Sequence, residues 1–280
     1  MNNNVSIKNA LISVYNKEGL EEIVKRLNDF GIKIYSTGGT EAFIKSLDIN
    51  VEKIEDLTTY PSILGGRVKT LHPKVFGGIL SRRDNKEDVL EVEKYQIINF
   101  DLVIVDLYPF EQTVKNNSSH QEIIEKIDIG GISLIRAAAK NYKDVLVISN
   151  KEQYHQFNSH LEENGPITNL DTRLEYASEA FNVSSHYDTM IFKFLNKKDK
   201  ICFKESKKET KKLRYGENPH QKGYYFGNLN DMFDQFNGKE LSYNNLLDID
   251  AAVNLISEFS ETTFAILKHN NACGISSRES

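Results

Sequence analysis

Hydrophobic residues in the first half of the chain occur either in short, β-prone stretches or at helical spacing. The short stretches predict strands at 10–14, 32–36, 101–107 and 145–148. Between the first two runs, apolar residues recur every three or four positions and predict a helix that ends at Gly31; they are Leu20, Ile23, Val24, Leu27 and Phe30. Strands and helices therefore alternate along this part of the chain.

Further helices are predicted by the same spacing. One covers 41–47, directly after Thr37-Gly-Gly-Thr40, and Thr40 has the side chain of an N-cap residue. Helical spacing returns from about 151 to 194, with a break at Gly165-Pro166. The run at 145–148 is apolar throughout, and that at 101–107 is apolar between Asp101 and Asp106, as in strands that are buried on both faces. The pattern as a whole predicts an α/β fold in which helices flank a parallel sheet.

A change of character near residue 197 predicts a domain boundary. Residues 197–212 are crowded with lysine and nearly free of apolar side chains, which favours a solvated connection between a domain at 1–196 and a segment at 213–280. An exposed charged hairpin within one domain is the alternative. The last segment has a helical pattern near 249–259 and a strand at 264–267. With fewer than about 80 residues, we expect it to be an incomplete domain.

Composition excludes several classes of protein. The 280 residues carry 35 Lys and Arg against 40 Asp and Glu, a net charge of −5, which argues against a nucleic-acid or membrane-surface binder. The sequence contains no signal peptide and no apolar stretch long enough to cross a bilayer. Its two cysteines, Cys202 and Cys273, are far apart, and its histidines are scattered. We therefore expect a cytoplasmic protein with no metal site.

Three Gly-Gly pairs lie where a ligand could bind. Gly38-Gly39 and Gly130-Gly131 each precede a predicted helix, and Gly65-Gly66 begins a basic loop. A glycine turn at the start of a helix exposes unpaired N–H groups, which bind phosphate or carboxylate. Any one pair alone is more often a plain turn. In a parallel sheet, however, ligands bind beyond the carboxyl ends of the strands, so three such pairs predict an anion site.

The basic loop supplies three side chains suited to one phosphate. Arg67 offers a guanidinium fork, Lys69 an ammonium and Thr70 a hydroxyl, with glycines before them and His72-Pro73 after them. A solvated basic loop is the alternative. We favour the anion site, because the glycines allow the backbone to approach a ligand closely.

Two further groups of residues could take part in proton transfer. Asp128 precedes Gly130-Gly131, Lys140 lies about two turns along the helix that follows, and Tyr108 ends a buried strand. Near the end of the chain, Lys268-His269 directly follows the predicted strand 264–267. Spacing alone does not distinguish these roles from a surface ion pair, a packed core tyrosine and a surface Lys-His pair.

At these motifs the sequence resembles the bifunctional purine biosynthesis proteins that combine IMP cyclohydrolase with AICAR transformylase. The resemblance runs from about Ala10 to the last residues, through STGGT, LGGRVKTLHP, LYPF, IDIGGISLIRAAAKN, LRYGENPHQ, GKELSYNNLLDIDAA and KHNNACG. It implies a methylglyoxal synthase-like fold for the first domain. For residues 213–280 it implies the start of an α+β, cytidine deaminase-like transformylase domain.

The resemblance implies that the first domain closes formylated aminoimidazole carboxamide ribotide (FAICAR) to IMP, with loss of water and without a cofactor. The implied nucleotide and phosphate site comprises Ser13, Lys17, Ser36, Gly39, Thr40, Arg67, Lys69, Thr70 and Gly130. The residues implied around the reacting base are Lys69, Tyr108, Asp128 and Lys140. We expect Asp128 to accept the carboxamide proton, with Lys140 and Tyr108 acting on the departing oxygen. Lys69 could serve the phosphate, the ring closure or both.

For the second activity, formyl transfer from 10-formyltetrahydrofolate to AICAR, the resemblance implies nucleotide binding by Arg214, Tyr215 and Asn245 and transfer by Lys268 and His269. It also implies a homodimer. Two positions depart from the family pattern. Asp106 stands where Asn is common, which weakens the case for a contact to the base, and Ala272 stands where Pro is usual.

Two other functions are compatible with the same fold. One is a phosphate-eliminating lyase such as methylglyoxal synthase, and the other is a nucleotide-sensing module without catalytic activity. The stretch from Asp128 to Lys140 and the motifs after residue 212 favour the cyclohydrolase over both.

We expect the 280-residue chain by itself to lack formyl transfer, because the family's transformylase region continues well beyond the length present here. Formyl transfer from 10-formyltetrahydrofolate to AICAR, measured with the purified chain, checks this expectation. Turnover near that of a full-length relative would refute it.

Overall fold

The structure is a computed structural model that describes residues 4–197 and 201–278. The chain divides into two compact units, residues 1–204 and 205–280, and each is described by itself. Residues 198–200 of the predicted lysine-rich connection, and the two chain ends, lie outside the described residues. None of the helices in the described ranges has the length and apolar character that crossing a membrane requires.

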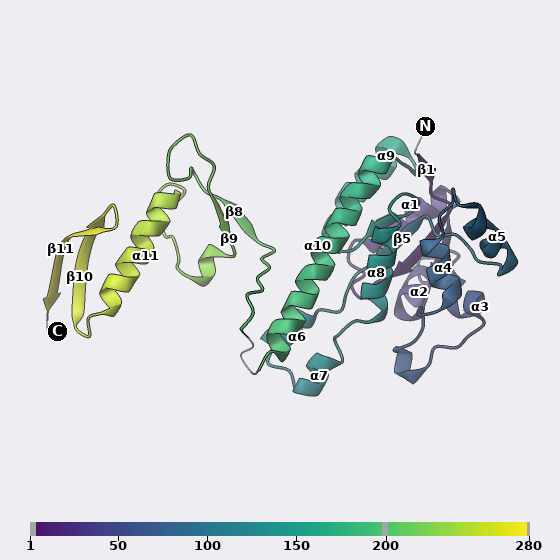
Figure 1. Ribbon diagram of the computed structural model, residues 1–280, viewed down its shortest axis with the longest axis horizontal. Helices are drawn as coiled ribbons and strands as arrows, with labels where there is room; N and C mark the ends of the chain where they lie inside the picture. Colours follow the sequence, from purple (N-terminus) through teal and green to yellow (C-terminus); the bar gives the residue numbers. More distant parts are fainter. Residues whose placement is uncertain (1–3, 198–200, 279–280) are drawn as a thin grey trace. The chain divides into compact units, whose positions relative to one another are not determined.

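A five-stranded parallel sheet forms the centre of the first unit (Figure 1). Its strand order is β4-β3-β2-β5-β6. The strands are β2 (Asn9–Ser13), β3 (Lys33–Ser36), β4 (Glu52–Lys53), β5 (Leu102–Val105) and β6 (Leu146–Ile148). From β2 the chain first adds strands on one side and then crosses to add β5 and β6 on the other. The strand order therefore reverses between β2 and β5, which is where parallel sheets bind ligands.

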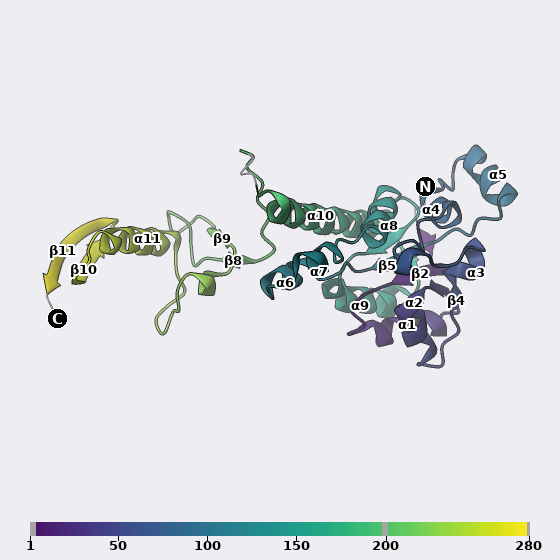
Figure 2. The ribbon, with the colours of Figure 1, turned by 90° about the horizontal axis from the view of Figure 1, so that it is seen from below.

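Helices cover both faces of this sheet, which confirms the predicted fold class (Figure 2). The helices are α1 (Leu20–Asp29), α2 (Gly38–Lys45), α3 (Ile54–Thr58), α4 (Pro73–Leu80), α5 (Lys86–Lys94), α6 (Phe110–Lys115), α7 (His120–Ile124), α8 (Gly130–Lys140), α9 (Tyr154–Asn164) and α10 (Leu170–Leu195). A short antiparallel pair, β1 (Val5–Ser6) with β7 (Ile167–Thr168), and the 3-10 turns η1 (Leu64–Gly66) and η2 (Lys151–Gln153) complete the unit.

The two faces of β2 pack against different helices. Ala10 and Ile12 join the core beneath α1 and α9, whereas Leu11 joins the core beneath α4, α8 and α10. All three side chains are fully buried. Because successive side chains of a strand point to opposite faces, a strand that is covered on both sides must be apolar throughout. This explains the continuous apolar runs in the sequence.

A buried carboxylate joins the starts of the two central strands. Asp101, just before β5, accepts hydrogen bonds from the backbone N–H groups of Lys8 (2.7 Å) and Asn9 (2.9 Å) at the start of β2. Arg83 forms an ion pair with the same carboxylate, which is only 6% exposed. Paired and hydrogen-bonded in this way, the buried charge is satisfied and fixes the register of β2 against β5.

The start of α2 differs from the prediction. The helix begins at Gly38, with Thr37 as its N-cap residue, so the expected N-cap at Thr40 is wrong. The Thr40 hydroxyl instead donates to the Val14 carbonyl (2.9 Å) and accepts from the Val14 N–H (3.0 Å). Thr40 therefore ties the first turn of α2 to the end of β2.

The second unit contains two hairpins and one long helix. The strands β8 (Thr210–Lys212) and β9 (Tyr224–Phe226) pair, the 3-10 turn η3 (Leu229–Asp231) follows, and α11 (Tyr243–Ser257) begins six residues before the predicted helix. The strand β10 (Thr262–Lys268) pairs with β11 (Asn271–Arg278), which the sequence did not predict. His269 and Asn270 both have positive φ, 52° and 62°, as a two-residue hairpin turn requires.

Two adjacent glycines of α4 give a test of close packing in the first unit. A Cβ at Gly78 would collide with the Ile98 carbonyl and lie 3.0 Å from the Phe100 ring. We expect Gly78→Ala to lower the free energy of unfolding by about 1–3 kcal/mol, since backbone must move to admit the methyl group. Chemical denaturation measures the change.

Gly77→Ala is the matched control, because its Cβ would meet only side-chain atoms of Ile97, the nearest at 2.9 Å. That side chain can rotate away, and alanine favours a helix by up to about 1 kcal/mol. Equal losses of stability in the two variants would contradict the packing described here.

Candidate functional site

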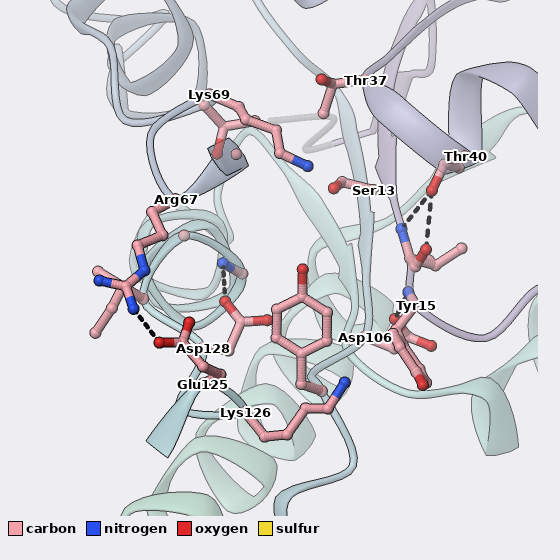
Figure 3. A pocket seen from close by; sticks show the side chains of 18 of the residues that line it. Ser13, Tyr15, Thr37, Thr40, Arg67, Lys69, Asp106, Glu125, Lys126 and Asp128 are labelled. Carbon is pink, nitrogen blue, oxygen red and sulfur yellow. Dashed lines mark hydrogen bonds and ion pairs between the residues drawn. The ribbon is translucent and has the colours of Figure 1, made fainter. Parts of the chain in front are cut away.

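A cavity of about 620 Å³ lies at the carboxyl ends of β2 and β5 (Figure 3). Its size falls within the range of ligand sites in proteins. Ten of the residues predicted for the first domain's site line it: Ser13, Lys17, Gly39, Thr40, Arg67, Lys69, Thr70, Tyr108, Asp128 and Gly130. The loops after β2 and β5 meet here because those two strands are parallel neighbours. The described residues include no group of His, Cys, Asp and Glu suited to holding a metal ion.

One end of the cavity is suited to an anion. The Lys17 Nζ donates to the carbonyls of Val14 and Tyr15, both at 2.8 Å, and within the described chain these bonds leave its third N–H for a ligand. Burial lowers the pKa of Lys17, Asp106 opposes that shift, and Lys69 adds to it. Two cations thus repel each other mildly at one place, and a bound anion would relieve that repulsion.

The glycines at the start of α2 lie between these two ammonium groups. A Cβ at Gly38 would lie 3.3 Å from the Lys69 Nζ, and one at Gly39 would lie 3.8 Å from the Lys17 Nζ. Gly38 also has a positive φ of 56°. The helix start therefore brings unpaired N–H groups beside two cations, which is the composition of a phosphate site. Figure 3 shows Lys69 and Ser13 pointing toward one another across this end.

Arg67 lines the cavity but already has a partner. Its guanidinium forms an ion pair with Glu125, toward which it reaches in Figure 3. The side chains are 66% and 43% exposed, so solvent weakens the pair to a contribution of about 0–1 kcal/mol. A phosphate could replace Glu125 at low cost.

At the other end of the cavity lies a buried carboxylate. Asp128 is 9% exposed, and its Oδ1 accepts the Gly131 N–H at 2.6 Å. Burial raises the pKa of Asp128, while backbone N–H groups of Gly131, Tyr108 and Ile132 and the charge of Lys69 act against the rise. The residue thus caps the start of α8 and is at the same time a carboxylate with increased basicity.

Gly131 is required by this arrangement. A Cβ there would lie 2.7 to 3.0 Å from the three atoms of the Asp128 carboxylate. Any side chain at this position would displace the carboxylate from the start of the helix. At Gly130, by contrast, a Cβ would only approach the Thr70 hydroxyl, at 3.4 Å.

Tyr108 lies beside Asp128 in an aromatic and cationic cluster. Its ring meets Tyr15 edge to face, with centroids 5.4 Å apart, and the Lys126 Nζ lies 5.2 Å from the Tyr15 centroid and 5.4 Å from that of Tyr108. Burial, and next the charge of Asp128, raise the pKa of Tyr108. The phenol therefore remains protonated at neutral pH and can donate a hydrogen bond.

Asp106 organises the loop after β2. Its carboxylate accepts from the backbone N–H of Asn16 at 2.8 Å and from that of Tyr15. Burial raises its pKa, and these two hydrogen bonds oppose the rise. Both oxygens serve the loop, which gives Asp106 a structural role here.

Two predicted site residues lie away from the cavity. Ser36 is fully buried and donates its hydroxyl to the Ile12 carbonyl at 2.7 Å, so it joins β3 to β2. Lys140 is exposed at the last residue of α8, whereas Asp128 lies before the first. The rise over ten helical residues, about 15 Å, separates the two ends. The expectation that Lys140 lies near the reacting base is therefore not met in this structure.

The remaining predicted residues belong to the second unit. Arg214 donates to the Tyr215 hydroxyl at 3.1 Å and stacks on its ring, and the Asn245 side chain accepts from Ser242 at the start of α11. Lys268 ends β10 and His269 occupies the hairpin turn. Arg214 and Tyr215 thus meet, while Asn245 has a capping role within α11.

Several residues that line the cavity are not among those predicted from the sequence. Tyr15, Thr37, Glu125 and Lys126 are all among them. Thr37 is buried and donates its hydroxyl to Glu55 at 2.7 Å. Each lies within a few residues of a predicted strand end or glycine pair, and that proximity is the signal that could have found them.

The fold and this cavity define an α/β domain of the MGS-like class, and residues 19–133 match the model of the MGS-like domain. Residues 138–280 match the model described as AICARFT/IMPCHase bienzyme. The chain belongs to this bienzyme family.

Individual relatives agree with that assignment. The chain is 60% identical to the bifunctional purine biosynthesis protein PurH of Bacteroides thetaiotaomicron, over 99% of this chain and 55% of that protein. It is 43% identical to the PurH of a Thermoanaerobacter species, over 96% of this chain and 54% of that protein. The chain thus spans about half the length of these curated relatives. The crystal structure of ForH matches with a TM-score of 0.57 and 32% identity, over 66% of this chain and 94% of that one.

The buried charge of Asp128 gives a prediction about stability. An acid whose pKa is raised by folding destabilises the fold once it ionises, and this cost is absent below its unfolded pKa of about 3.9. We expect Asp128→Asn to be more stable than the parent chain at pH 7, with a difference that shrinks as the pH falls toward 4. Urea denaturation at several pH values measures it.

Glu122→Gln is a control of opposite sign. Hydrogen bonds from Ser119 lower the pKa of Glu122, so its charge favours the fold at neutral pH and that contribution disappears in acid. A loss of stability for Asp128→Asn at pH 7 would contradict the burial cost assigned to Asp128.

Proposed function

We propose that this chain closes FAICAR to IMP, and that residues 1–196 form the cyclohydrolase domain responsible. The observation that carries the proposal is that one cavity combines an anion site at one end with a buried carboxylate of raised pKa at the other. A nucleotide carries a phosphate at one end and a base at the other. The bifunctional purine biosynthesis relatives support the choice of substrate.

The reaction depends mainly on how the protein positions the two reacting groups of one substrate molecule. The carboxamide nitrogen attacks the formyl carbon of the same molecule, so a C–N bond forms and the formyl oxygen becomes an alkoxide. A proton moves from that nitrogen to the alkoxide, which becomes a hydroxyl group. The hydroxyl takes up a second proton and departs as water, while the former formamide nitrogen loses its N–H proton and forms the C=N bond of the new ring. Because nucleophile and electrophile are already joined, the protein has to hold a reactive rotamer, stabilise the oxyanion and move two protons.

Asp128 and Tyr108 are suited to the two proton transfers. A carboxylate with a raised pKa is a stronger base near neutral pH, which fits Asp128 to accept the proton of the carboxamide nitrogen. Tyr108 retains its proton and can donate to the oxygen, and the Lys126 ammonium beside its ring favours negative charge there. No step is assigned to Lys140, which is exposed at the far end of α8.

The phosphate would bind where α2 begins. Lys17, Lys69 and the N–H groups of Gly38 and Gly39 supply the charge and hydrogen bonds, with Thr70 and Arg67 nearby. The closeness of the Lys69 Nζ to Gly38 favours the phosphate over the base as its partner. The Ser13 hydroxyl faces the same end.

The second activity, formyl transfer from 10-formyltetrahydrofolate to AICAR, is proposed for the whole protein to which the longer relatives correspond. Arg214, Tyr215, Asn245, Lys268 and His269 are the candidates for it in the second unit. We also propose a homodimer, by resemblance to the family, and a cytoplasmic location. The two free, exposed cysteines, Cys202 and Cys273, suit a reducing compartment.

A phosphate-eliminating lyase of the MGS-like class is the second candidate, since the match over residues 19–133 and the anion site would suit it as well. A sensor module would need the anion site alone. The buried Asp128 beside a protonated phenol favours ring closure over a sensor.

The ultraviolet change on purine ring closure tests the proposal directly. We expect the purified chain to convert FAICAR to IMP and Asp128→Asn to retain IMP binding while kcat falls by a factor of about 100 or more, since the base is lost. Lys69→Ala should instead raise KM and weaken IMP binding about tenfold or more. Stopped-assay kinetics and calorimetric titration with IMP separate the two effects.

The outcomes distinguish the candidates. IMP binding without ring closure by the parent chain would support the sensor, and release of phosphate from dihydroxyacetone phosphate would support the lyase. A fall in kcat at unchanged KM for Lys69→Ala would move Lys69 from the phosphate to the reacting base.

A further inference from the structure

The long helix α10 lies alongside α8, the helix that follows Asp128 (Figures 1 and 2). One residue of α10 reaches the segment between α7 and α8. The Tyr187 hydroxyl donates to the Lys126 carbonyl at 2.6 Å and accepts from the Asp128 N–H at 2.9 Å. One phenol therefore holds two backbone groups that flank Ile127.

The Tyr187 side chain is held in place by burial and packing. Its side chain is 7% exposed, and its ring packs edge to face on Phe110 with centroids 6.0 Å apart. Burial raises the pKa of Tyr187 strongly, so the hydroxyl remains protonated and keeps both of its roles, as donor and as acceptor. A buried hydroxyl with both hydrogen bonds made holds its neighbours in one geometry.

The same helix also holds the other side of the cavity. Phe110, which packs on Tyr187, begins α6 two residues after Tyr108. Next to Tyr187, the His186 Nε2 contacts the Glu111 carboxylate of α6 at 2.8 Å. His186 and Tyr187, successive residues of α10, thus contact the helix that follows Tyr108 and the backbone that precedes Asp128.

Tyr187 and Asp128 belong to parts of the chain that match different family models. The match to the MGS-like domain ends at residue 133, whereas α10 spans Leu170–Leu195 within the region that matches the bienzyme family. The MGS-like part supplies most of the cavity residues, Tyr108 and Asp128 among them. The helix α10, which lies outside that part, fixes the positions of Tyr108 and Asp128, the two residues proposed to transfer protons.

We propose that Tyr187 is a positioning residue for the site, whose hydroxyl holds the Lys126–Asp128 backbone so that the Asp128 carboxylate faces the reacting amide. The effect on catalysis rests on the proposed ring closure; the effect on the backbone does not. Without the hydroxyl, the Asp128 N–H and the Lys126 carbonyl lose their common partner and the segment gains freedom.

Tyr187→Phe and Tyr176→Phe make a matched pair. Tyr176 is also on α10, is 2% exposed, and its hydroxyl has no hydrogen-bond partner among the described residues. We expect Tyr187→Phe to lower kcat for ring closure about tenfold, because the Asp128 carboxylate is misplaced. The KM should change less than about twofold, because the residues that bind the phosphate are unaltered. Tyr176→Phe should match the parent chain in both constants.

Amide hydrogen exchange of the full chain gives the second measurement. We expect exchange in residues 126–132 to accelerate in Tyr187→Phe and to stay unchanged in Tyr176→Phe, with circular dichroism showing that both variants are folded. Unchanged exchange in Tyr187→Phe would overturn the proposal, and so would faster exchange with an unchanged kcat. An equal fall of kcat in both variants would show a general effect of altering α10 and would also overturn it.

A parent chain that does not close the ring would reject the proposed function and, with it, the catalytic effect assigned to Tyr187. Exchange in residues 126–132 would then decide the structural part alone: acceleration in Tyr187→Phe would uphold the backbone clamp, and its absence would reject the clamp as well.

Discussion

The parallel pairing of β2 with β5 is the interaction on which the site depends. It places Ser13 opposite Val105, so the loops that leave the two strands emerge side by side. Asp101 fixes this register at the other end of the strands through the N–H groups of Lys8 and Asn9. A slip of one residue would turn every side chain of β2 to the wrong face. The anion site and the carboxylate share one cavity because this register brings their loops together.

Burial sets the chemistry within that cavity. Asp106 and Asp128 are both desolvated, which raises their pKa values, and both are held by backbone N–H groups that limit the rise. Lys17, also desolvated, has a lowered pKa. Desolvation thus brings the pKa values of carboxylate and ammonium groups in this cavity closer together. Desolvation of these charges lowers the free energy of unfolding. The large apolar core on both faces of the sheet supplies the stability that offsets this loss.

The helix α10 lies in the part of the chain that matches the bienzyme family and contacts the MGS-like part. Its buried side packs on β6 and α8, and through Tyr187 and Phe110 it contacts the segments that carry Asp128 and Tyr108. An MGS-like sheet can carry different functions, since the loops and not the sheet supply the reacting groups. A helix that fixes two of those loops is one way in which a shared fold becomes specialised for one reaction.

The sequence by itself determined the parallel sheet, most of its helices and the residue types of the cavity. Runs such as 101–107 admit little besides a doubly covered strand, and the glycine pairs at 38–39 and 130–131 mark helix starts, because these are local properties of the chain. The tertiary structure decided which of the candidate residues meet. Ser36 faces the core, Lys140 lies at the far end of α8 and Arg67 pairs with Glu125, although their motifs suggested otherwise. Tyr187 lies 59 residues from Asp128, and no local pattern marks that contact. Periodicity reports which face a residue takes within its own element, whereas distances between elements arise only when the whole core packs.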